Sequence, residues 1–174
     1  MTQGEYNDQI QSWAHQRGWQ DTASKALRDH RLLDWLFSSM LGEDELPARH
    51  AAEVIRLVSD KNKNVILPYL VGCLKKLETE CPDGVRRCIF RMLQHTDIPE
   101  EHQSTALELA FRDLRDYSQP IAIRVFAMST VANIARSYPE LLQELIAEIT
   151  PNLSEQSAGF RNRAMKIING TWKP

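Results

Sequence analysis

The sequence predicts an all-α protein, an α-solenoid of about four two-helix repeats followed by a final helix. Apolar residues recur at three- and four-residue spacing, and sustained strand-like alternation of apolar and polar residues is missing. Similar residues also return after about 37 positions along most of the chain. A period of this length, with two antiparallel helices in each unit, is typical of an α-solenoid.

The helical pattern is clearest over residues 107–114 and 141–149, where apolar side chains fall on one face. Two short runs predict where such helices begin. Ser137–Glu140 and Asp97–Glu100 each place a capping residue two positions before a proline and three before a glutamate. This order predicts a capping box with proline in the first turn.

The period is carried by four arginines, Arg49, Arg86, Arg124 and Arg161, which are separated by 37, 38 and 37 residues. Three positions after them come Ala52, Ile89, Ala127 and Ala164. Twenty-one positions after the first three arginines come Leu70, Leu107 and Leu145, and four positions further on come Leu74, Phe111 and Ile149. One period earlier, Leu33 and Phe37 stand at these two positions. We therefore expect a single domain over residues 1–174. Its repeats are predicted at 5–42, 46–79, 82–116 and 119–155, with a final helix at 157–170.

The residues around these arginines resemble HEAT repeats. The run Asp116–Ala127 has an acidic turn and a proline before an apolar-Arg-x-x-Ala helix, and Glu80–Arg86 is similar to it. Tyr138–Leu142 resembles the opening of a HEAT second helix. The resemblance covers residues 46 to 169, although Glu45 and Ser157 replace the proline in two repeats. It implies a right-handed stack with the second helices lining a concave face.

Candidate binding residues follow from this implied groove, which lies two positions beyond each register leucine and one turn later. The candidates are Arg31, Trp35, Lys75, Lys76, Leu109 and Arg112. Trp35 is the candidate aromatic anchor, and the cations are the candidate charged contacts, because aromatics and arginine dominate binding energy at protein interfaces. The alternative is that Trp35 closes the core and the lysines form a solvated face.

Composition indicates an ordinary globular chain. Its 174 residues are 43% hydrophobic and 25% charged, with a formal net charge of -2, which excludes disordered, collagen-like and disulfide-scaffold classes. The charge alternates along the chain: residues 61–91 carry +4, residues 97–155 carry -6, and residues 161–173 carry +4. Because the acidic block interrupts any continuous basic stripe, this distribution favours a protein partner over nucleic acid.

The sequence has few motifs for metal binding, cofactor binding or catalysis. Cys73, Cys81, Cys88, His95 and His102 have ligand chemistry, but Cys88 and His95 lie about 10.5 Å apart along one predicted helix. Zinc ligands must lie within about 4 Å of one another, so we expect no metal site. Glycine-rich phosphate loops and a nucleophile elbow are missing. We therefore expect no cofactor and no catalytic residue.

The expected function is a non-catalytic adaptor or scaffold that binds a protein or peptide, with self-association through the C-terminal unit as a second option. No signal peptide or membrane span is expected, because the first residues lack a basic-then-apolar pattern and the uncharged run Asn64–Leu74 is too short. We expect a cytoplasmic protein, since three cysteines lack disulfide spacing.

One enzymatic alternative stays open, because the chain is similar to HEAT-like DNA glycosylases in size and helical repeat architecture. In that family a groove carboxylate stabilises charge at the sugar while tryptophans contact the nucleotide. Trp35 with Asp113 or Glu108 would take those roles here. A likeness to HEAT-like bilin lyase subunits depends on the fold alone.

Overall fold

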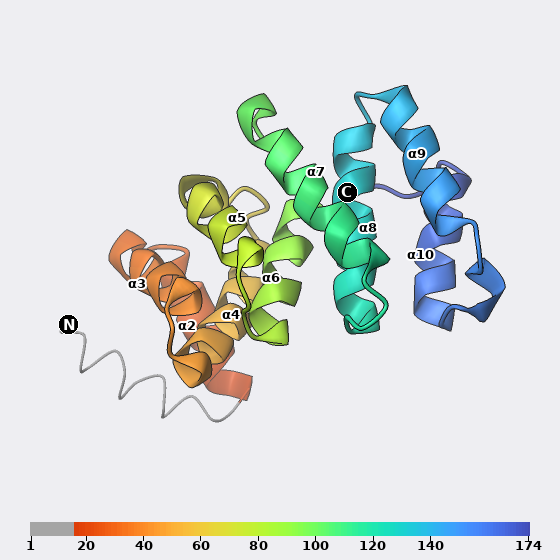
Figure 1. The fold of residues 1–174 in the computed structure, drawn as a ribbon. Coiled ribbons are helices and arrows are strands. Elements are labelled where there is room, and N and C mark those ends of the chain that lie inside the picture. The colour runs from red at the N-terminus through yellow and green to blue at the C-terminus, as the bar shows by residue number, and fades with distance from the viewer. Residues whose placement is uncertain (1–15) are drawn as a thin grey trace. The chain divides into compact units, whose positions relative to one another are not determined.

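The computed structural model describes residues 16–174, and over these residues the regular elements are all helices (Figure 1). The all-α prediction is therefore confirmed. The chain divides into two compact parts, residues 1–88 and 89–174, which we name the N-terminal half and the C-terminal half. The division falls inside α6 (Asp83–Leu93). Each half is described by itself.

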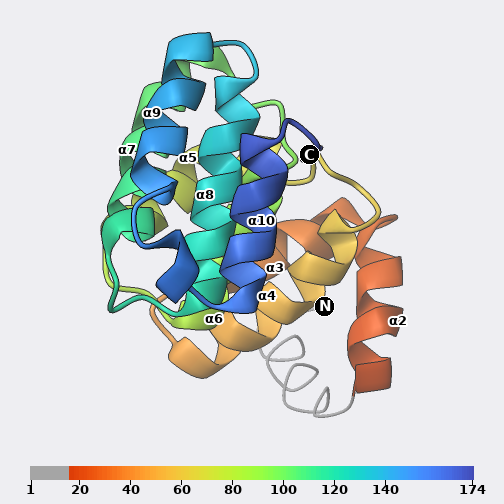
Figure 2. The same cartoon turned by 90° about the vertical axis from the view of Figure 1, so that its right-hand side faces the viewer.

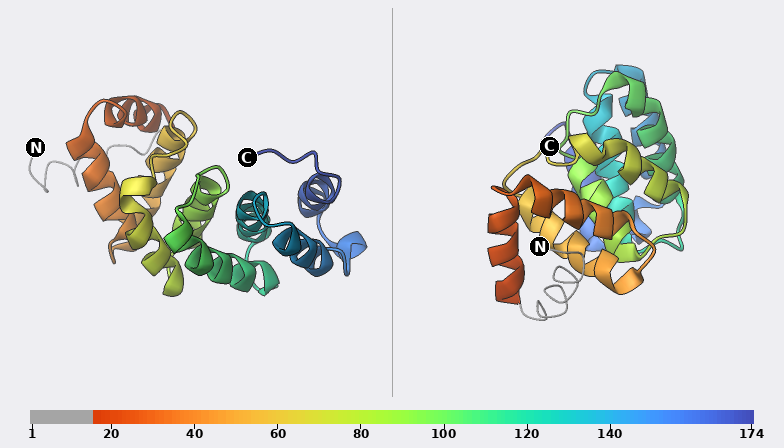
Figure 3. Two further views of the ribbon diagram at one scale, coloured as in Figure 1. Left: turned by 90° about the horizontal axis from the view of Figure 1, so that it is seen from above. Right: turned by 90° about the vertical axis from the view of Figure 1, so that its left-hand side faces the viewer.

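The N-terminal half contains α2 (Gln16–Ala26), α3 (His30–Leu41), α4 (Glu45–Ser59), the short 3-10 helix η1 (Leu67–Tyr69) and α5 (Leu70–Glu78). α2 lies across α3 and α4 and packs against both of them, as Figures 2 and 3 show. α3 in turn contacts α5. These contacts make α3 and α4 the centre of this half.

The core of the N-terminal half is built around Phe37, which is fully buried. Its ring stacks on Tyr69 with 3.8 Å between the centroids, and the Tyr69 hydroxyl donates a hydrogen bond to Asp34. Gly72 of α5 lies against α3, because a Cβ atom there would be only 3.0 Å from Leu41 Cδ1. Glycine at this position therefore allows the close approach of α5 to α3.

The C-terminal half contains the end of α6, then α7 (Glu100–Arg115), α8 (Ile121–Ala135), α9 (Pro139–Ile149), the 3-10 helix η2 (Leu153–Glu155) and α10 (Ala158–Ile168). α8 contacts α7, α9 and α10 and is buried from residue 127 to residue 135 (Figure 2). This burial on several sides explains why its sequence is apolar or small nearly all round, since an outer helix would carry one apolar stripe.

Polar residues on buried α8 satisfy main-chain groups at the end of α6. The Asn133 side-chain amide donates to the carbonyl oxygens of Leu93 and Thr96, at 3.1 and 2.8 Å. The Thr130 hydroxyl lies 3.3 Å from the Phe90 carbonyl oxygen. The last carbonyls of a helix have no i+4 partner within that helix, so Asn133 replaces water as a donor to Leu93 and Thr96.

The two predicted capping boxes are wrong in detail. α9 does begin with Pro139, but its N-cap residue is Tyr138 and makes no side-chain capping bond. α7 begins at Glu100 after Pro99, again without a side-chain cap. The residue before a proline is driven out of the helical region. Tyr138 is accordingly extended, with φ -136° and ψ 91°, which leaves Ser137 outside the helix start.

The register arginines have a shared structural role. Arg86 is buried and donates to the Leu77 and Thr79 carbonyl oxygens at the end of α5, at 3.3 and 2.8 Å. Arg124 is buried and donates from Nε to the Leu114 carbonyl oxygen at the end of α7, at 3.0 Å. We call α6, α8 and α10 the first helices of their repeats and α5, α7 and α9 the second helices. In each case the arginine of a first helix satisfies carbonyls at the end of the preceding second helix.

The outer two members of the register behave differently. Arg161 donates to the carbonyl oxygens of Ser154 and Gln156, at 3.1 and 2.9 Å, which lie in and just after η2 instead of at the end of α9. Arg49, however, is exposed and pairs within its own helix with Glu45 at 3.3 Å. Residue Glu45 stands where two other repeats carry a proline. Donation to the end of the preceding second helix is therefore made by two of the four register arginines, Arg86 and Arg124.

Replacing Arg124 by methionine should lower the free energy of unfolding by about 2 kcal/mol, because buried carbonyl oxygens lose a charged donor. Arg49→Met removes an exposed ion pair within one helix and should lower the free energy of unfolding by less than about 0.5 kcal/mol. Urea denaturation followed by circular dichroism measures both. Equal losses would contradict the structural role assigned to Arg124.

Candidate functional site

The predicted binding residues of the N-terminal half divide into buried and exposed members. Trp35 on α3 is only 7% exposed, and the Lys76 side chain on α5 is 10% exposed, with Nζ donating to the Gly42 carbonyl oxygen at 2.9 Å. Arg31 and Lys75 are exposed. Trp35 therefore serves packing, and little of its surface is available to a partner. Contact of Arg31 and Lys75 with a partner stays a prediction.

The predicted residues of the C-terminal half divide in the same way. Leu109 on α7 is 5% exposed, whereas Arg112 is exposed. The physical reason is the rotation of α7 about its axis. Its buried side includes Ala106, Leu109 and Asp113, whereas the register residue Leu107 is only half-buried. Counting two positions beyond the register leucine therefore reached the core instead of a free surface.

The carboxylates considered for glycosylase chemistry are placed differently from each other. The Asp113 side chain is 2% exposed and accepts a hydrogen bond from Arg112 Nε at 2.9 Å, whereas Glu108 is exposed. Trp35 lies in the other half of the chain. The Asp113 carboxylate is thus buried at α7, so a substrate would have to displace the surrounding side chains to reach it.

The cysteines are not arranged for metal or nucleophilic chemistry. Over residues 16–174 no three His, Cys, Asp or Glu side chains come together to hold a metal ion. Cys73 is buried, and this burial raises the pKa of its thiol well above the ordinary value. The Cys88 thiol lies 3.2 Å from the Ala52 carbonyl oxygen, to which it donates. Both thiols therefore behave as packed core groups.

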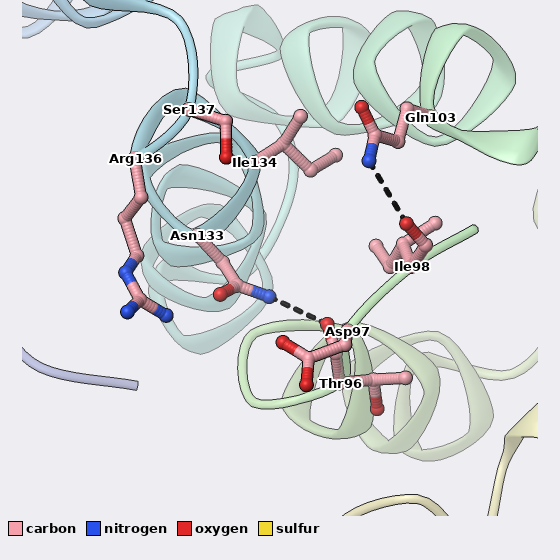
Figure 4. Close-up of a pocket in the computed structure, with 8 residues that line it drawn as sticks. All are labelled: Thr96, Asp97, Ile98, Gln103, Asn133, Ile134, Arg136 and Ser137. Atoms are coloured by element: carbon pink, nitrogen blue, oxygen red, sulfur yellow. Dashed lines mark hydrogen bonds between the residues drawn. The ribbon is translucent and has the colours of Figure 1, made fainter. Parts of the chain in front are cut away.

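A polar pocket of about 340 Å³ lies in the C-terminal half, where α8 ends. It is lined by Thr96, Asp97, Ile98, Gln103, Asn133, Ile134, Arg136 and Ser137. Figure 4 shows the Arg136 guanidinium on one side of the α8 end and Gln103 with Ile98 on the other side, with Asn133 and Asp97 between them. The walls thus come from α7, α8 and the α6–α7 connection.

Several polar groups in this pocket are available to a ligand. Asn133 and the Gln103 amide use their NH2 groups internally, the latter toward the Ile98 carbonyl oxygen at 2.9 Å, which leaves both amide oxygens as acceptors. The Asp97 and Arg136 side chains are exposed and make no ion pair or hydrogen bond with the described residues. The pocket therefore offers amide acceptors beside one negative and one positive group.

A second polar feature of the C-terminal half is Arg163 on α10. Its Nη1 donates to Gln94 Oε1 at 2.9 Å and to Ser129 Oγ at 2.5 Å. Both acceptors are neutral, and no carboxylate of residues 16–174 pairs with this guanidinium. Desolvation lowers the pKa of Arg163 from its ordinary value. Within the described part of the chain, Arg163 is consequently a half-buried cation whose side-chain partners are neutral.

The comparisons with known proteins bear on the fold. A model of the HEAT repeat domain matches residues 6–170. The chain belongs to the HEAT-repeat family. No curated protein and no solved structure matches it. This result confirms the predicted resemblance and the α-solenoid class, and HEAT repeats are helical scaffolds often used for protein interaction. Within residues 16–174, none of the helices is long and apolar enough to cross a membrane.

Sequence reasoning missed both polar features of this HEAT-repeat chain. Arg136 and Asn133 fall within or just after a helix whose apolar pattern gave no sign of a pocket at its end. Arg163 and Gln94 are 69 positions apart, so no local pattern could pair them.

Replacing Trp35 by alanine should lower the free energy of unfolding by about 3 kcal/mol, because it empties a large volume in the N-terminal core. Lys75→Ala, at an exposed position of the neighbouring α5, should change it by less than about 0.5 kcal/mol. Thermal and urea unfolding test both variants. A near-neutral Trp35→Ala would restore the groove role first predicted for Trp35.

Mild alkylation should modify Cys81 well before the other two cysteines. Cys81 is half-buried, whereas Cys73 and Cys88 are buried, and burial raises the pKa of Cys73 so that little thiolate forms near neutral pH. Iodoacetamide treatment of the folded protein, followed by peptide mass spectrometry, measures the order. Labelling of Cys73 at the rate of Cys81 would refute its assignment to the core.

Proposed function

We propose that this HEAT-repeat protein is a non-catalytic scaffold that binds a protein or peptide partner. Its family supports the proposal, because the stacked helices of such repeats present extended surfaces on a fixed frame. The side chains that hold the frame are buried main-chain partners such as Arg86 and Arg124. Surface residues can then vary without loss of the fold, which suits a binding module.

The observation that carries the proposal is the pocket at the end of α8. A peptide offers main-chain NH groups, carbonyl groups and charged side chains. The pocket presents the complementary set: the amide oxygens of Asn133 and Gln103, the Arg136 guanidinium and the Asp97 carboxylate. A volume of about 340 Å³ suits one or two residues of a peptide. Such mixed polarity favours recognition over reaction.

Exposed side chains elsewhere extend the surface that a partner could cover. Arg31 and Lys75 are exposed in the N-terminal half, and Arg112 is exposed in the C-terminal half. Arginine is enriched at protein interfaces. We propose these three as peripheral contacts, secondary to the pocket.

The alternative function is nucleic-acid binding, and one observation favours keeping it. The acidic block of residues 97–155 is not spread over every helix, because α8 (Ile121–Ala135) contains no aspartate or glutamate. Its acidic residues lie on α7, α9 and the connections. The sequence argument that this block repels a phosphate backbone therefore applies to α7, α9 and the connections and not to α8.

Affinity capture from cell extract tests the proposed function. The wild-type protein and a pocket variant, Asp97→Asn with Arg136→Ala, are compared after nuclease treatment of the extract. We expect wild-type protein to retain specific proteins that the variant retains at least about tenfold less, as for loss of an interfacial arginine. Quantitative mass spectrometry of the bound fraction gives the ratio.

A matched control is Arg28→Ala with Asp21→Asn, a pair of exposed charges in the N-terminal half. This control should capture the same proteins as the wild type. Capture that disappears on nuclease treatment would contradict the protein-binding proposal and support the nucleic-acid alternative. Equal capture by the pocket variant would remove the pocket from the binding site.

A further inference from the structure

The pocket at the end of α8 lies at the carboxyl ends of two helices. Asn133 and Ile134 belong to the last turn of α8, and Thr96 and Asp97 follow shortly after the end of α6. The carboxyl end of a helix carries partial negative charge on its unpaired carbonyl groups, which favours a cation nearby. The backbone around the pocket therefore supports a positively charged ligand group.

Asn133 supplies the pocket with an acceptor of fixed orientation. The residue is 9% exposed, and its amide nitrogen donates to the carbonyl oxygens of Leu93 and Thr96 at 3.1 and 2.8 Å. These two bonds use both N–H groups and decide which end of the amide is the oxygen. Among the described residues no donor pairs with that oxygen, although buried polar atoms are nearly always hydrogen-bonded. A ligand that donates a hydrogen bond in the pocket would pair it.

Asp97 supplies the same pocket with a charged acceptor. Its carboxylate is exposed and makes no ion pair or hydrogen bond with the described residues. Figure 4 shows Asn133 and Asp97 between the Arg136 guanidinium on one side and Gln103 on the other. The middle of the pocket thus presents one neutral and one negatively charged acceptor.

Arg136 borders these acceptors without pairing with either of them. It is the C-cap residue of α8, and its exposed side chain makes no ion pair or hydrogen bond with the described residues. The charges of Asp97 and Arg136 cancel at a distance, so the pocket has no long-range attraction for cations in general. Recognition of a cation therefore depends on hydrogen bonds made at contact.

We propose that this pocket binds the side chain of an arginine in the partner protein. The inference rests on the proposed function and names the group of the partner that the pocket recognises. A guanidinium carries five N–H donors in one plane, so it can donate two hydrogen bonds to the Asp97 carboxylate and another to the Asn133 oxygen. Arg136 stays available to a carbonyl or carboxylate group of the same partner.

The set of acceptors favours arginine over other ligands. A lysine ammonium group is a strongly hydrated point charge and cannot make the bidentate contact with a carboxylate. A metal ion would need more ligands, and no three His, Cys, Asp or Glu side chains come together within residues 16–174. An anion would meet Asp97 and the unpaired Asn133 oxygen. The pocket volume of about 340 Å³ suits one side chain with its adjoining main chain.

Titration of the full chain followed by ¹H–¹⁵N NMR tests the inference. The probes are capped Gly-X-Gly tripeptides in which X is arginine, lysine or citrulline, which has the shape of arginine but no charge. We expect the arginine peptide to shift the Asn133 side-chain amide resonance with a Kd of about 1 mM. The lysine peptide should bind at least about threefold more weakly, and the citrulline peptide at least about tenfold more weakly.

Exposed substitutions locate the binding, and thermal unfolding of each variant is measured in parallel. Asp97→Asn replaces the carboxylate by a neutral group of the same shape and should weaken binding of the arginine peptide at least about tenfold. Asp97→Glu keeps the charge, and Arg136→Ala removes only a bordering cation, so both should stay within about threefold of the wild type. The matched control is Glu108→Gln, at an exposed carboxylate of α7 outside the pocket, which should bind like the wild type.

The outcomes separate this inference from the proposed function. Equal binding of the arginine peptide and either other peptide, or an equal loss in Asp97→Asn and the control, would overturn the arginine inference. A tenfold loss in Arg136→Ala would also overturn it, because the pocket would then recognise an anion. Capture of proteins by a chain that does not bind the arginine peptide would leave the scaffold function standing and remove only this inference. Binding of the peptide without capture of any protein would contradict the scaffold function and leave the preference for arginine.

Discussion

The rest of the structure depends on one contact, the arginine of a first helix that donates to carbonyls at the end of the preceding second helix. Arg86 does this for α5 and Arg124 for α7. A helix end exposes carbonyls that must find donors, and here the donor comes from the next repeat. The Arg124 guanidinium also lies between the Tyr117 and Phe160 rings, 4.1 and 5.0 Å from their centroids. Each contact fixes the turn between consecutive helices.

Fixing the turns has a consequence for function. First and second helices keep separate positions in each half, so residues that alternate along the chain become sorted in space. In the C-terminal half this sorting gathers acidic side chains on α7 and α9 and leaves α8 and α10 without them. A polar pocket then lies at the end of α8, where the exposed Asp97 and Arg136 side chains line it. Recognition of a partner is the role that such an arrangement supports.

The sequence predicted the helical class and the repeat because both depend on periodic burial, and the register of Arg86, Arg124 and Arg161 survived as a set of real contacts. It failed where tertiary packing decides. Trp35 and Leu109 were assigned to a surface by counting from a leucine, yet the broad buried stripes of α3 and α7 include them. Charge summed along residues 97–155 concealed the fact that α8 carries no aspartate or glutamate. Arg163 meets Gln94 across 69 positions.

The most direct measurement of the arginine contact is solution NMR of the arginine side-chain Nε–H groups. The contact predicts a distinct Arg124 Nε–H resonance that exchanges slowly with water, because this group donates to the buried Leu114 carbonyl oxygen at 3.0 Å. Arg49, exposed and paired only with Glu45, should exchange rapidly and serves as the internal reference. An Arg124 resonance that exchanges as fast as that of Arg49 would contradict the contact on which the repeat frame depends.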